Sequence, residues 1–304
     1  MQGRGKRSGL RVSLPATSAN LGPGFDAVGL AMSLQLVVEA HPAAHDRIEA
    51  TGRDAERCGV LKDNLILDTY RSVLQAAGKP ITPLHLAVEN EIPLGMGCGS
   101  SAAARLAGIA LARHFGELAM DDAAVVAEGS RREGHPDNIA ACWYGGFTIS
   151  VPSGDGVMAA TFPCDGTWQL VLALPAAGLA TEKARAMLPG EFSREDAVFN
   201  VQRSALLTAA FAQERLELLR VAMEDRLHQP HRKQACTLLD HLHVLHHAPE
   251  FAGVALSGAG PALLAILAQR AQLHAAEARL RAVLGDSVEL LPVRIGGSAT
   301  IEVV

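Results

Sequence analysis

EIPLGMGCGSS, from Glu91 to Ser101, is the most informative stretch of this chain. It follows an apolar run that predicts a strand over Leu84–Val88, and it precedes an Ala-rich run that predicts a helix over about Ala102–His114. Glycines let the backbone come close to a ligand, and the first amide groups of a helix have no partner within it. A strand, a glycine loop and a helix N-terminus in this order predict a site for an anion such as phosphate.

The loop matches neither of the common phosphate-binding patterns. No Lys follows the glycines, which excludes G-x-x-x-x-G-K-[ST], and the third glycine comes one residue too early for G-x-G-x-x-G. A plain glycine turn before a helix is the alternative interpretation. Ser100 and Ser101 count against it, because their hydroxyl groups can reach a phosphate or Mg²⁺.

The composition excludes two classes of protein. The 304 residues include 27 Lys and Arg and 32 Asp and Glu, so the formal net charge is −5, whereas a protein that coats nucleic acid needs a basic surface. Hydrophobic residues make up 49% of the chain and supply a large core. No run approaches the roughly 20 apolar residues of a bilayer span. We expect neither nucleic acid nor a membrane as a partner.

The cysteines and the start of the chain indicate the compartment. The five cysteines are widely spaced and contain no C-x-x-C pair, which argues against a disulfide scaffold or a structural zinc site. The basic first residues lack the apolar region that follows them in a signal peptide. These features predict a cytoplasmic protein.

The order of the predicted elements favours an α+β fold over a doubly wound sheet. Short strands are expected at Leu10–Leu14 and Leu34–Ala40, on either side of a Gly/Pro-rich loop over Pro15–Gly29. Further on, Phe251–Leu267 predicts a strand, a glycine turn and a strand. The length favours two domains. We place the boundary near residue 165, which gives domains 1–165 and 166–304.

Two further glycine-rich segments carry a resemblance. PATSANLGPGFD, at Pro15–Asp26, and ALSGAGP, at Ala255–Pro261, resemble with Glu91–Ser101 the three signature motifs of the GHMP small-molecule kinases. Within that family the opening PATSANLGPGFDAVGLA is similar to that of the bacterial homoserine kinases. The resemblance continues in order through EGHPDN (133–138), YGGF (144–147), TEKAR (181–185) and LHQPHR (227–232). Two departures are Cys98, where the loop usually carries Leu, and Ala262, where a hydroxyl residue is common.

The resemblance implies a fold and an activity. The fold is the two-domain GHMP kinase fold, with a ribosomal-protein-S5-domain-2-like N-terminal domain, which binds ATP, and a ferredoxin-like α/β-plait C-terminal domain. The implied activity uses ATP and Mg²⁺ to phosphorylate L-homoserine to O-phospho-L-homoserine, a step of threonine biosynthesis, in the cleft between the domains. Another small alcohol or amino alcohol is the alternative substrate. A homodimer is a further expectation.

The substrate suggests which residues would bind it. Homoserine is a zwitterion with a distant hydroxyl, so its site needs an anion for the ammonium group and cations for the carboxylate. Asp26 can supply the anion, while Arg185 and Arg232 can supply the planar forks that carboxylates favour. Without the motifs, Arg185 would be interpreted as a surface residue beside Glu182. By resemblance, three more residues complete the pocket: Asn20 and His135 near the hydroxyl, and Thr181.

The nucleotide and its metal are expected at the glycine loop. The predicted ATP-binding residues are Asn64, Pro93, Leu94, Gly95, Met96, Gly97, Cys98, Gly99, Ser100 and Ser101. Asn64 resembles an asparagine that family members use near the adenine or ribose, and it is equally well explained as the N-cap of the next helix. The predicted Mg²⁺ ligands are Ser100 and Glu128, because family members place a glutamate upstream of the His-x-Asp-Asn segment. Glu133 is the rival.

Three residues are predicted to be catalytic: Asn20, Asn138 and Arg185. Homoserine kinases carry Asn at the place of Asn138, where related kinases have an aspartate that acts as base. An amide accepts no proton at neutral pH, so the hydroxyl proton is expected to leave to the γ-phosphate or to water. Asp137 is the one carboxylate next to it.

Other interpretations explain less of the sequence. A nucleotide-dependent oxidoreductase would need the G-x-G-x-x-G spacing and an acidic residue on a second strand, and both are missing. A ligand-binding relative without activity is disfavoured because the site residue types are retained. The His-rich stretch His241–His247 suggests a metal, but no carboxylate or Cys completes a ligand set at suitable spacing. Exposed helix histidines are the better interpretation there.

Overall fold

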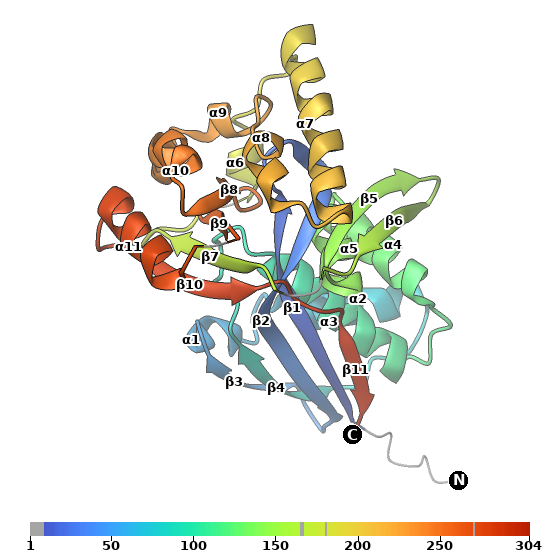
Figure 1. The fold of residues 1–304 in the computed structure, drawn as a ribbon. Helices are drawn as coiled ribbons and strands as arrows, with labels where there is room; N and C mark the ends of the chain where they lie inside the picture. The colour runs from blue at the N-terminus through green and yellow to red at the C-terminus, as the bar shows by residue number, and fades with distance from the viewer. Residues whose placement is uncertain (1–8, 165–166, 180, 270) are drawn as a thin grey trace, which may run out of the picture.

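The computed structural model describes residues 9–164, 167–179, 181–269 and 271–304, without the side chains of Thr181 and Glu182. Within these residues the chain forms two sheets with helices packed against them (Figure 1). Hairpins predominate in both sheets, and the predicted α+β class is confirmed.

The first sheet has seven strands in the order β11-β1-β2-β4-β3, with β5 paired to β2 and β6 paired to β5. The β3–β4 pair is parallel, and the other pairs of this sheet are antiparallel. Its strands are β1 (Leu10–Asn20), β2 (Gly24–Pro42), β3 (Arg47–Gly52), β4 (Leu84–Asn90), β5 (Phe147–Ser153), β6 (Gly156–Phe162) and β11 (Thr300–Val303).

The first hairpin corrects the predicted loop over Pro15–Gly29. Strand β1 continues to Asn20 and β2 begins at Gly24, so only a tight turn separates them. The register shifts between Pro15 and Ala16, and the turn is made with positive φ at Asn20. The proline and glycines here mark a bulge and a tight turn, which a Gly/Pro count alone does not distinguish from a loop.

Helices α2 to α5 pack together on the first sheet, with α3 at their centre (Figure 1). The side chains of Asn64 and Asp121 cap α2 and α4. Helix α5 lies close against β2, because a Cβ on Gly29 would stand 2.4 Å from the carbonyl oxygen of Asp137. The helices of this half are α1 (Ala55–Cys58), α2 (Leu65–Ala76), α3 (Ser100–Phe115), α4 (Asp122–Glu133) and α5 (Asp137–Tyr144).

The second sheet is antiparallel and has the order β10-β7-β9-β8. Its strands are β7 (Gln169–Leu174), β8 (Phe251–Leu256), β9 (Leu263–Leu267) and β10 (Glu289–Arg294), which confirms the strand, turn and strand expected over 251–267. Both faces are covered: Leu170 and Leu172 join the main core with Phe211, whereas Val171 packs with Leu280 on the opposite face.

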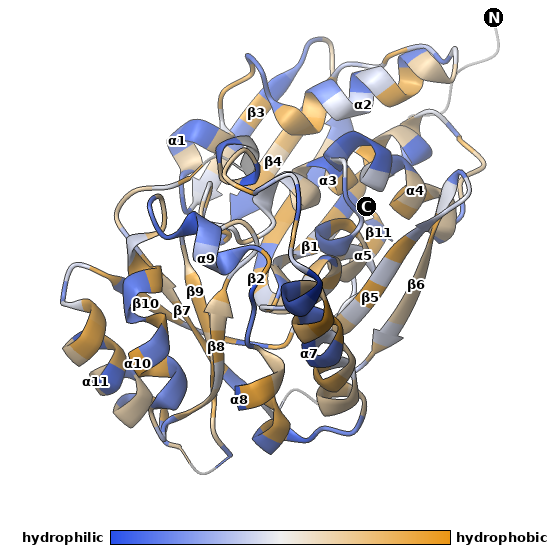
Figure 2. Cartoon of the chain, turned by 90° about the horizontal axis from the view of Figure 1, so that it is seen from above, coloured by the Kyte–Doolittle hydropathy of each residue, from blue (hydrophilic) through white to orange (hydrophobic). Residues whose placement is uncertain are grey.

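Helices of very different length belong to this half of the chain. Figure 2 shows β8 and β9 as largely hydrophobic and α9 as hydrophilic. The helices are α6 (Thr181–Arg185), α7 (Arg194–Ala212), η1 (Leu216–Leu218), α8 (Leu219–Ala222), α9 (Gln229–Arg232), η2 (Thr237–His241), α10 (Leu242–His247) and α11 (Leu273–Leu284).

The last strand returns to the first sheet. β11 pairs with β1, with Val303 opposite Leu10, so the C-terminus lies beside the start of the described chain (Figure 1). The division into domains 1–165 and 166–304 remains a prediction. Strand β11 belongs to the second of these ranges but pairs in the first sheet. Among the described residues, no helix combines the length and the apolar character needed to cross a bilayer.

Candidate active site

Two cavities flank the glycine loop and share Gly95, Ser100 and Ser101 in their walls. The first, the charged cavity, measures about 270 Å³ and is lined by Asn20, Asp26, Glu133, His135, Asp137, Asn138, Arg185 and Arg232, among others. The second, the neighbouring cavity, measures about 330 Å³ and has apolar residues of β4, the start of α2 and the loop before α3 in its wall, together with the segment from α1 to α2, which adds Arg57, Lys62 and Asp63. The start of α3 therefore faces both spaces.

The three glycines of the loop serve different purposes. All have positive φ, 72° at Gly95, 77° at Gly97 and 71° at Gly99. A Cβ on Gly97 would lie 2.1 Å from the carbonyl oxygen of Ser257, and one on Gly99 would clash with Thr17. A Cβ on Gly95 meets nothing within 4 Å. Gly97 and Gly99 permit close packing within the protein, and only Gly95 has open space beside it.

The third glycine segment clamps the loop onto β1. The Ser257 hydroxyl lies 2.9 Å from the carbonyl oxygen of Gly97 and 2.9 Å from the Ser18 hydroxyl. The Gly258 amide donates to the carbonyl oxygen of Ala19 at 3.0 Å. The three segments that carry the resemblance thus meet at one place, although the third lies about 160 residues from the glycine loop in sequence.

Asp26 and Arg185 form a bidentate ion pair across the charged cavity. Arg185 Nη1 donates to Asp26 Oδ2 at 3.0 Å and Nη2 donates to Oδ1 at 2.5 Å. Asn20 holds this corner, because its Oδ1 accepts from the Asp26 amide at 3.0 Å and its Nδ2 donates to the carbonyl oxygen of Gly258 at 2.9 Å. The pair is about one-third exposed, so a ligand can reach both charges.

Arg232 is the second cation of the cavity and is only 1% exposed. Its Nη1 donates to His228 Nδ1 at 2.9 Å and to the carbonyl oxygen of Gly258 at 3.3 Å, and its Nε donates to that of Ala184 at 3.3 Å. Within the described part of the chain, no carboxylate forms an ion pair with it. A buried guanidinium without an anion is costly, and burial lowers the pKa of Arg232. The cavity is therefore suited to a ligand that brings a negative group.

His135, Asp137 and Asn138 line the wall formed at the start of α5. His135 Nδ1 lies 2.5 Å from Asp137 Oδ1. Burial lowers the pKa of His135, but the hydrogen bond and the charge of Asp137 outweigh it, so the pKa is raised overall. Asn138 Oδ1 accepts from the Thr17 hydroxyl at 2.7 Å. The amide of Asn138 is thereby oriented by β1.

A cation would meet several acceptors in this corner. Ligand atoms of Asp26, His135 and Asp137 lie within 4.8 Å of one another. Mg²⁺ prefers oxygen ligands, and one member of this trio offers nitrogen. The trio therefore fits an organic ammonium group at least as well as a metal ion.

Glu133 lines the charged cavity and Glu128 does not, while the assignment of Ser100 and Glu128 to Mg²⁺ remains a prediction. Glu133 accepts from the Ser101 hydroxyl and from Arg105 Nε, the latter at 2.7 Å. Glu128 pairs with Arg131 and with Arg132, whose Nε lies 2.6 Å from its Oε1. Glu133, the alternative in the sequence analysis, is thus the glutamate that lies beside the start of α3, where the glycine loop ends.

Other predicted nucleotide residues are divided between the two cavities. Leu94 lines the neighbouring cavity, Gly97, Cys98 and Gly99 line the charged cavity, and Pro93 and Met96 line neither. Burial raises the pKa of the Cys98 thiol to about 12, so it is inert at neutral pH. The side chain of Thr181 lies outside the described residues.

Asn64 borders the neighbouring cavity with its amide already occupied. Its Oδ1 caps α2 through the amide of Leu67, and its Nδ2 donates to the carbonyl oxygens of Cys58 and Val60 at 3.2 and 3.1 Å. The N-cap alternative therefore describes what this side chain does here.

Comparison with known proteins identifies the family. The model of the GHMP kinase N-terminal domain matches residues 64–146. A homoserine kinase of Solibacter usitatus is 44% identical over 262 residues, which cover 84% of each chain. A homoserine kinase of Desulfitobacterium hafniense is 35% identical over 297 residues, 96% of this chain and 100% of that one. The chain belongs to the homoserine kinase family. A solved homoserine kinase of Cytophaga hutchinsonii has the same fold, with a TM-score of 0.79 at 22% identity over 99% of this chain and 100% of that one.

The site of this homoserine kinase family member contains residues that sequence reasoning passed over. Thr17, which orients Asn138, lies inside the PATSAN motif, and His228, which contacts Arg232, lies inside LHQPHR. Phe25 lies between the two arginines, with each guanidinium carbon 5.6 Å from its ring centre. Their position inside the quoted motifs is the signal that would have found them.

Proposed function

We propose that this chain transfers a phosphoryl group from ATP to L-homoserine and forms O-phospho-L-homoserine. The observation that carries the proposal is the convergence of the Asp26 carboxylate with the guanidinium groups of Arg185 and Arg232 in a single cavity at the start of α3. Such a cavity is complementary to a zwitterionic amino acid beside an anion site. The activity is a step of threonine biosynthesis, which we place in the cytoplasm.

The zwitterion would exchange partners with the Asp26–Arg185 pair. The α-ammonium group takes Asp26, with Asp137 near by, and the α-carboxylate takes Arg185 and Arg232, which has no carboxylate partner in the described part of the chain. The guanidinium of Arg185 loses one carboxylate and gains another, so binding leaves neither charge without a partner. Asn20 and His135 would then lie toward the hydroxyl group of the substrate.

The nucleotide would lie across the glycine loop. Gly99 precedes α3 in the left-handed conformation, and no side chain caps the helix. The first amide groups of α3 are therefore available to phosphate. The neighbouring cavity, with its apolar wall, would take the adenosine portion. The two reacting groups would thus approach from opposite sides of Ser100.

The residues at the start of α3 fit Mg²⁺. The hydroxyl groups of Ser100 and Ser101 and the carboxylate of Glu133 are oxygen donors at one edge of the cavity, which is the donor set this ion prefers. When bound with ATP, the ion neutralises charge on the phosphates. We therefore assign Ser100 and Glu133 to the metal.

The protein's part in the chemistry is to position the substrate. Asn138 cannot act as a base, because an amide accepts no proton at neutral pH and its oxygen already accepts from Thr17. The hydroxyl proton leaves to a phosphate oxygen or to water, and catalysis depends on the alignment of the hydroxyl with the γ-phosphate.

Two glycine variants separate ligand contact from packing. Gly95→Ala adds a methyl group in open space and should raise the KM for ATP about tenfold, with a stability cost of about 1–2 kcal/mol from its positive φ. Gly97→Ala places a Cβ against the carbonyl oxygen of Ser257. It should lower stability by the same amount for its positive φ and by about 1–3 kcal/mol more from overpacking. Thermal unfolding and initial rates measure both. A larger rise in the KM for ATP in a folded Gly97→Ala protein than in Gly95→Ala would contradict the assignment of Gly95 to ligand contact and of Gly97 to packing.

A substrate screen tests the function itself. In a coupled assay of ADP release, L-homoserine should give turnover, and L-serine, mevalonate and galactose should not. Turnover with another of these alcohols and none with L-homoserine would overturn the proposal. A homodimer, our proposed assembly, is tested by light scattering on the same preparation.

A further inference from the structure

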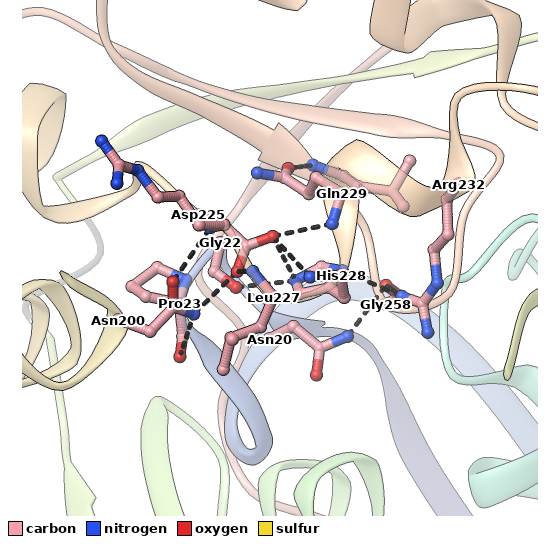
Figure 3. Close-up of polar contacts among 12 residues, drawn as sticks. Asn20, Gly22, Pro23, Asn200, Asp225, Leu227, His228, Gln229, Arg232 and Gly258 are labelled. Atoms are coloured by element: carbon pink, nitrogen blue, oxygen red, sulfur yellow. Dashed lines mark hydrogen bonds and ion pairs between the residues drawn. The ribbon is translucent and has the colours of Figure 1, made fainter. Parts of the chain in front are cut away.

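His228 is buried beneath the charged cavity and touches none of the space itself. It is fully buried, and it lies between α9, the β1–β2 turn and the ring of Phe25, whose centre is 5.4 Å from its own. Its Nε2 lies 2.7 Å from the carbonyl oxygen of Gly22, and its Nδ1 lies 2.9 Å from Arg232 Nη1 (Figure 3).

These two contacts fix the protonation of the ring. A carbonyl oxygen only accepts and a guanidinium only donates. The imidazole must therefore donate from Nε2 to Gly22 and accept at Nδ1 from Arg232, which is the neutral Nε2–H form. Burial lowers the pKa of His228, in agreement with this form. The ring is an acceptor dedicated to Arg232.

The backbone of His228 is held just as firmly. Asp225, whose side chain is fully buried, accepts from the amides of Leu227, His228 and Gln229 at 3.0, 3.0 and 2.7 Å (Figure 3). Gln229 in turn accepts from the amide of Leu256 in β8 at 2.7 Å. The imidazole consequently has little freedom to turn away from Arg232.

The contacts of Arg232 show what this support achieves. The carbonyl oxygens of Ala184 and Gly258 accept from Nε and Nη1, and His228 accepts from Nη1. None of the hydrogen bonds among the described residues uses Nη2, which remains for a ligand. Among the described residues all acceptors of Arg232 are neutral, so they orient its charge without cancelling it.

We propose that His228 is a positioning residue that aims Arg232 at the substrate carboxylate and ties it to the β1–β2 turn. The inference rests on the proposed function, since it takes the ligand to be an amino acid. A carboxylate in place of the imidazole would pair with Arg232 and compete with the substrate. A neutral acceptor avoids this competition.

Two substitutions divide the two hydrogen bonds of the ring. His228→Asn retains an acceptor near the position of Nδ1 and loses the donor to Gly22. His228→Gln offers a donor near the position of Nε2 and loses the acceptor for Arg232. His231→Gln, at an exposed histidine of α9, the helix that follows His228, is the matched control.

The readout is the preference for a carboxylate. For His228→Gln we expect the KM for L-homoserine to rise about tenfold, as for one hydrogen bond to a charged group. The preference for L-homoserine over 2-amino-1,4-butanediol, which lacks the carboxylate, should fall by the same factor, while the KM for ATP stays near that of the wild type. His228→Asn should retain most of the preference, and His231→Gln all of it.

Unchanged preference in folded His228→Gln, or equal losses with both substrates and ATP, would overturn the proposal. Wild-type protein that phosphorylates neither compound would refute the proposed function instead. Nitrogen NMR of the wild-type imidazole decides the matter even where the variants do not fold. The Nε2–H form, with an Nδ1 signal that shifts on addition of L-homoserine and not of ATP, supports the proposal, and the Nδ1–H form excludes it.

Discussion

Arg185→Ala should lower kcat/KM for L-homoserine about 10- to 150-fold. The guanidinium contributes a charge-assisted bond of about 1.5–3 kcal/mol to the carboxylate, and about 1.4 kcal/mol corresponds to a factor of ten. Arg185→Lys should recover only part of the loss, because an ammonium group does not reproduce the bidentate fork. The KM for ATP should hardly change, since Arg185 lines only the charged cavity.

The ion pair with Asp26 makes this test sharper. In the free protein Arg185 occupies the carboxylate that the substrate ammonium needs. With 2-amino-1,4-butanediol, which has an ammonium group and no carboxylate, the arginine only competes. Arg185→Ala should therefore leave the rate with this compound unchanged or raise it. A parallel fall with both compounds would show that Arg185 supports the pocket in general and does not bind the carboxylate.

The sequence predicts much of this fold because strands and helices with clear periodicity are also the buried ones. The glycine loop, α3 and the β8–β9 hairpin are found where they are expected. The β1–β2 hairpin is not, because small residues and prolines in a buried strand look like a loop until the pairing partner is known. Helix α5 is missed as well, since it is short and most of its residues are buried.

The sequence motifs allow the residues of the candidate site to be predicted, but not the contacts between them. Asn20, Asp26, His135, Arg185 and Arg232 come together in one cavity, as the resemblance implies. No pattern in the chain foretells that Asp26 pairs with Arg185, because these residues are 159 positions apart. Likewise, the three glycines of the loop cannot be told apart in the sequence. In the structure two of them pack against Ser257 and Thr17, and the third has open space beside it.

The choice between the two glutamates illustrates the limit most clearly. Glu128 and Glu133 lie on the same helix, α4, five positions apart. At 3.6 residues per turn they point about 140° apart, so only one can face α3. Sequence spacing gives the angle between them and not the direction in which the helix is rotated. In the folded chain α4 packs against α3 with Glu133 on the facing side, where it accepts from the Ser101 hydroxyl.

This geometry leads to the largest effect we expect. Glu133→Gln should lower kcat about 10²–10³-fold, the size of effect seen when one preorganised electrostatic group is removed from a transition state. The Mg²⁺ concentration for half-maximal activity should rise as well, because a neutral amide is a poorer ligand for this ion than a carboxylate. Initial rates over a Mg²⁺ titration at saturating ATP and L-homoserine measure both quantities.

The same helix supplies the control for that experiment. Glu128 is as little exposed as Glu133, 12% against 9%, and is also paired with arginine. Because it faces Arg131 and Arg132 and not the cavity, Glu128→Gln should alter neither kcat nor the Mg²⁺ dependence. Glu133→Gln also deprives Arg105 of its carboxylate, and Arg105→Met reproduces that loss alone. If Arg105→Met or Glu128→Gln matched the defect of Glu133→Gln, the carboxylate of Glu133 would be a structural partner of α3 and not a ligand of the metal.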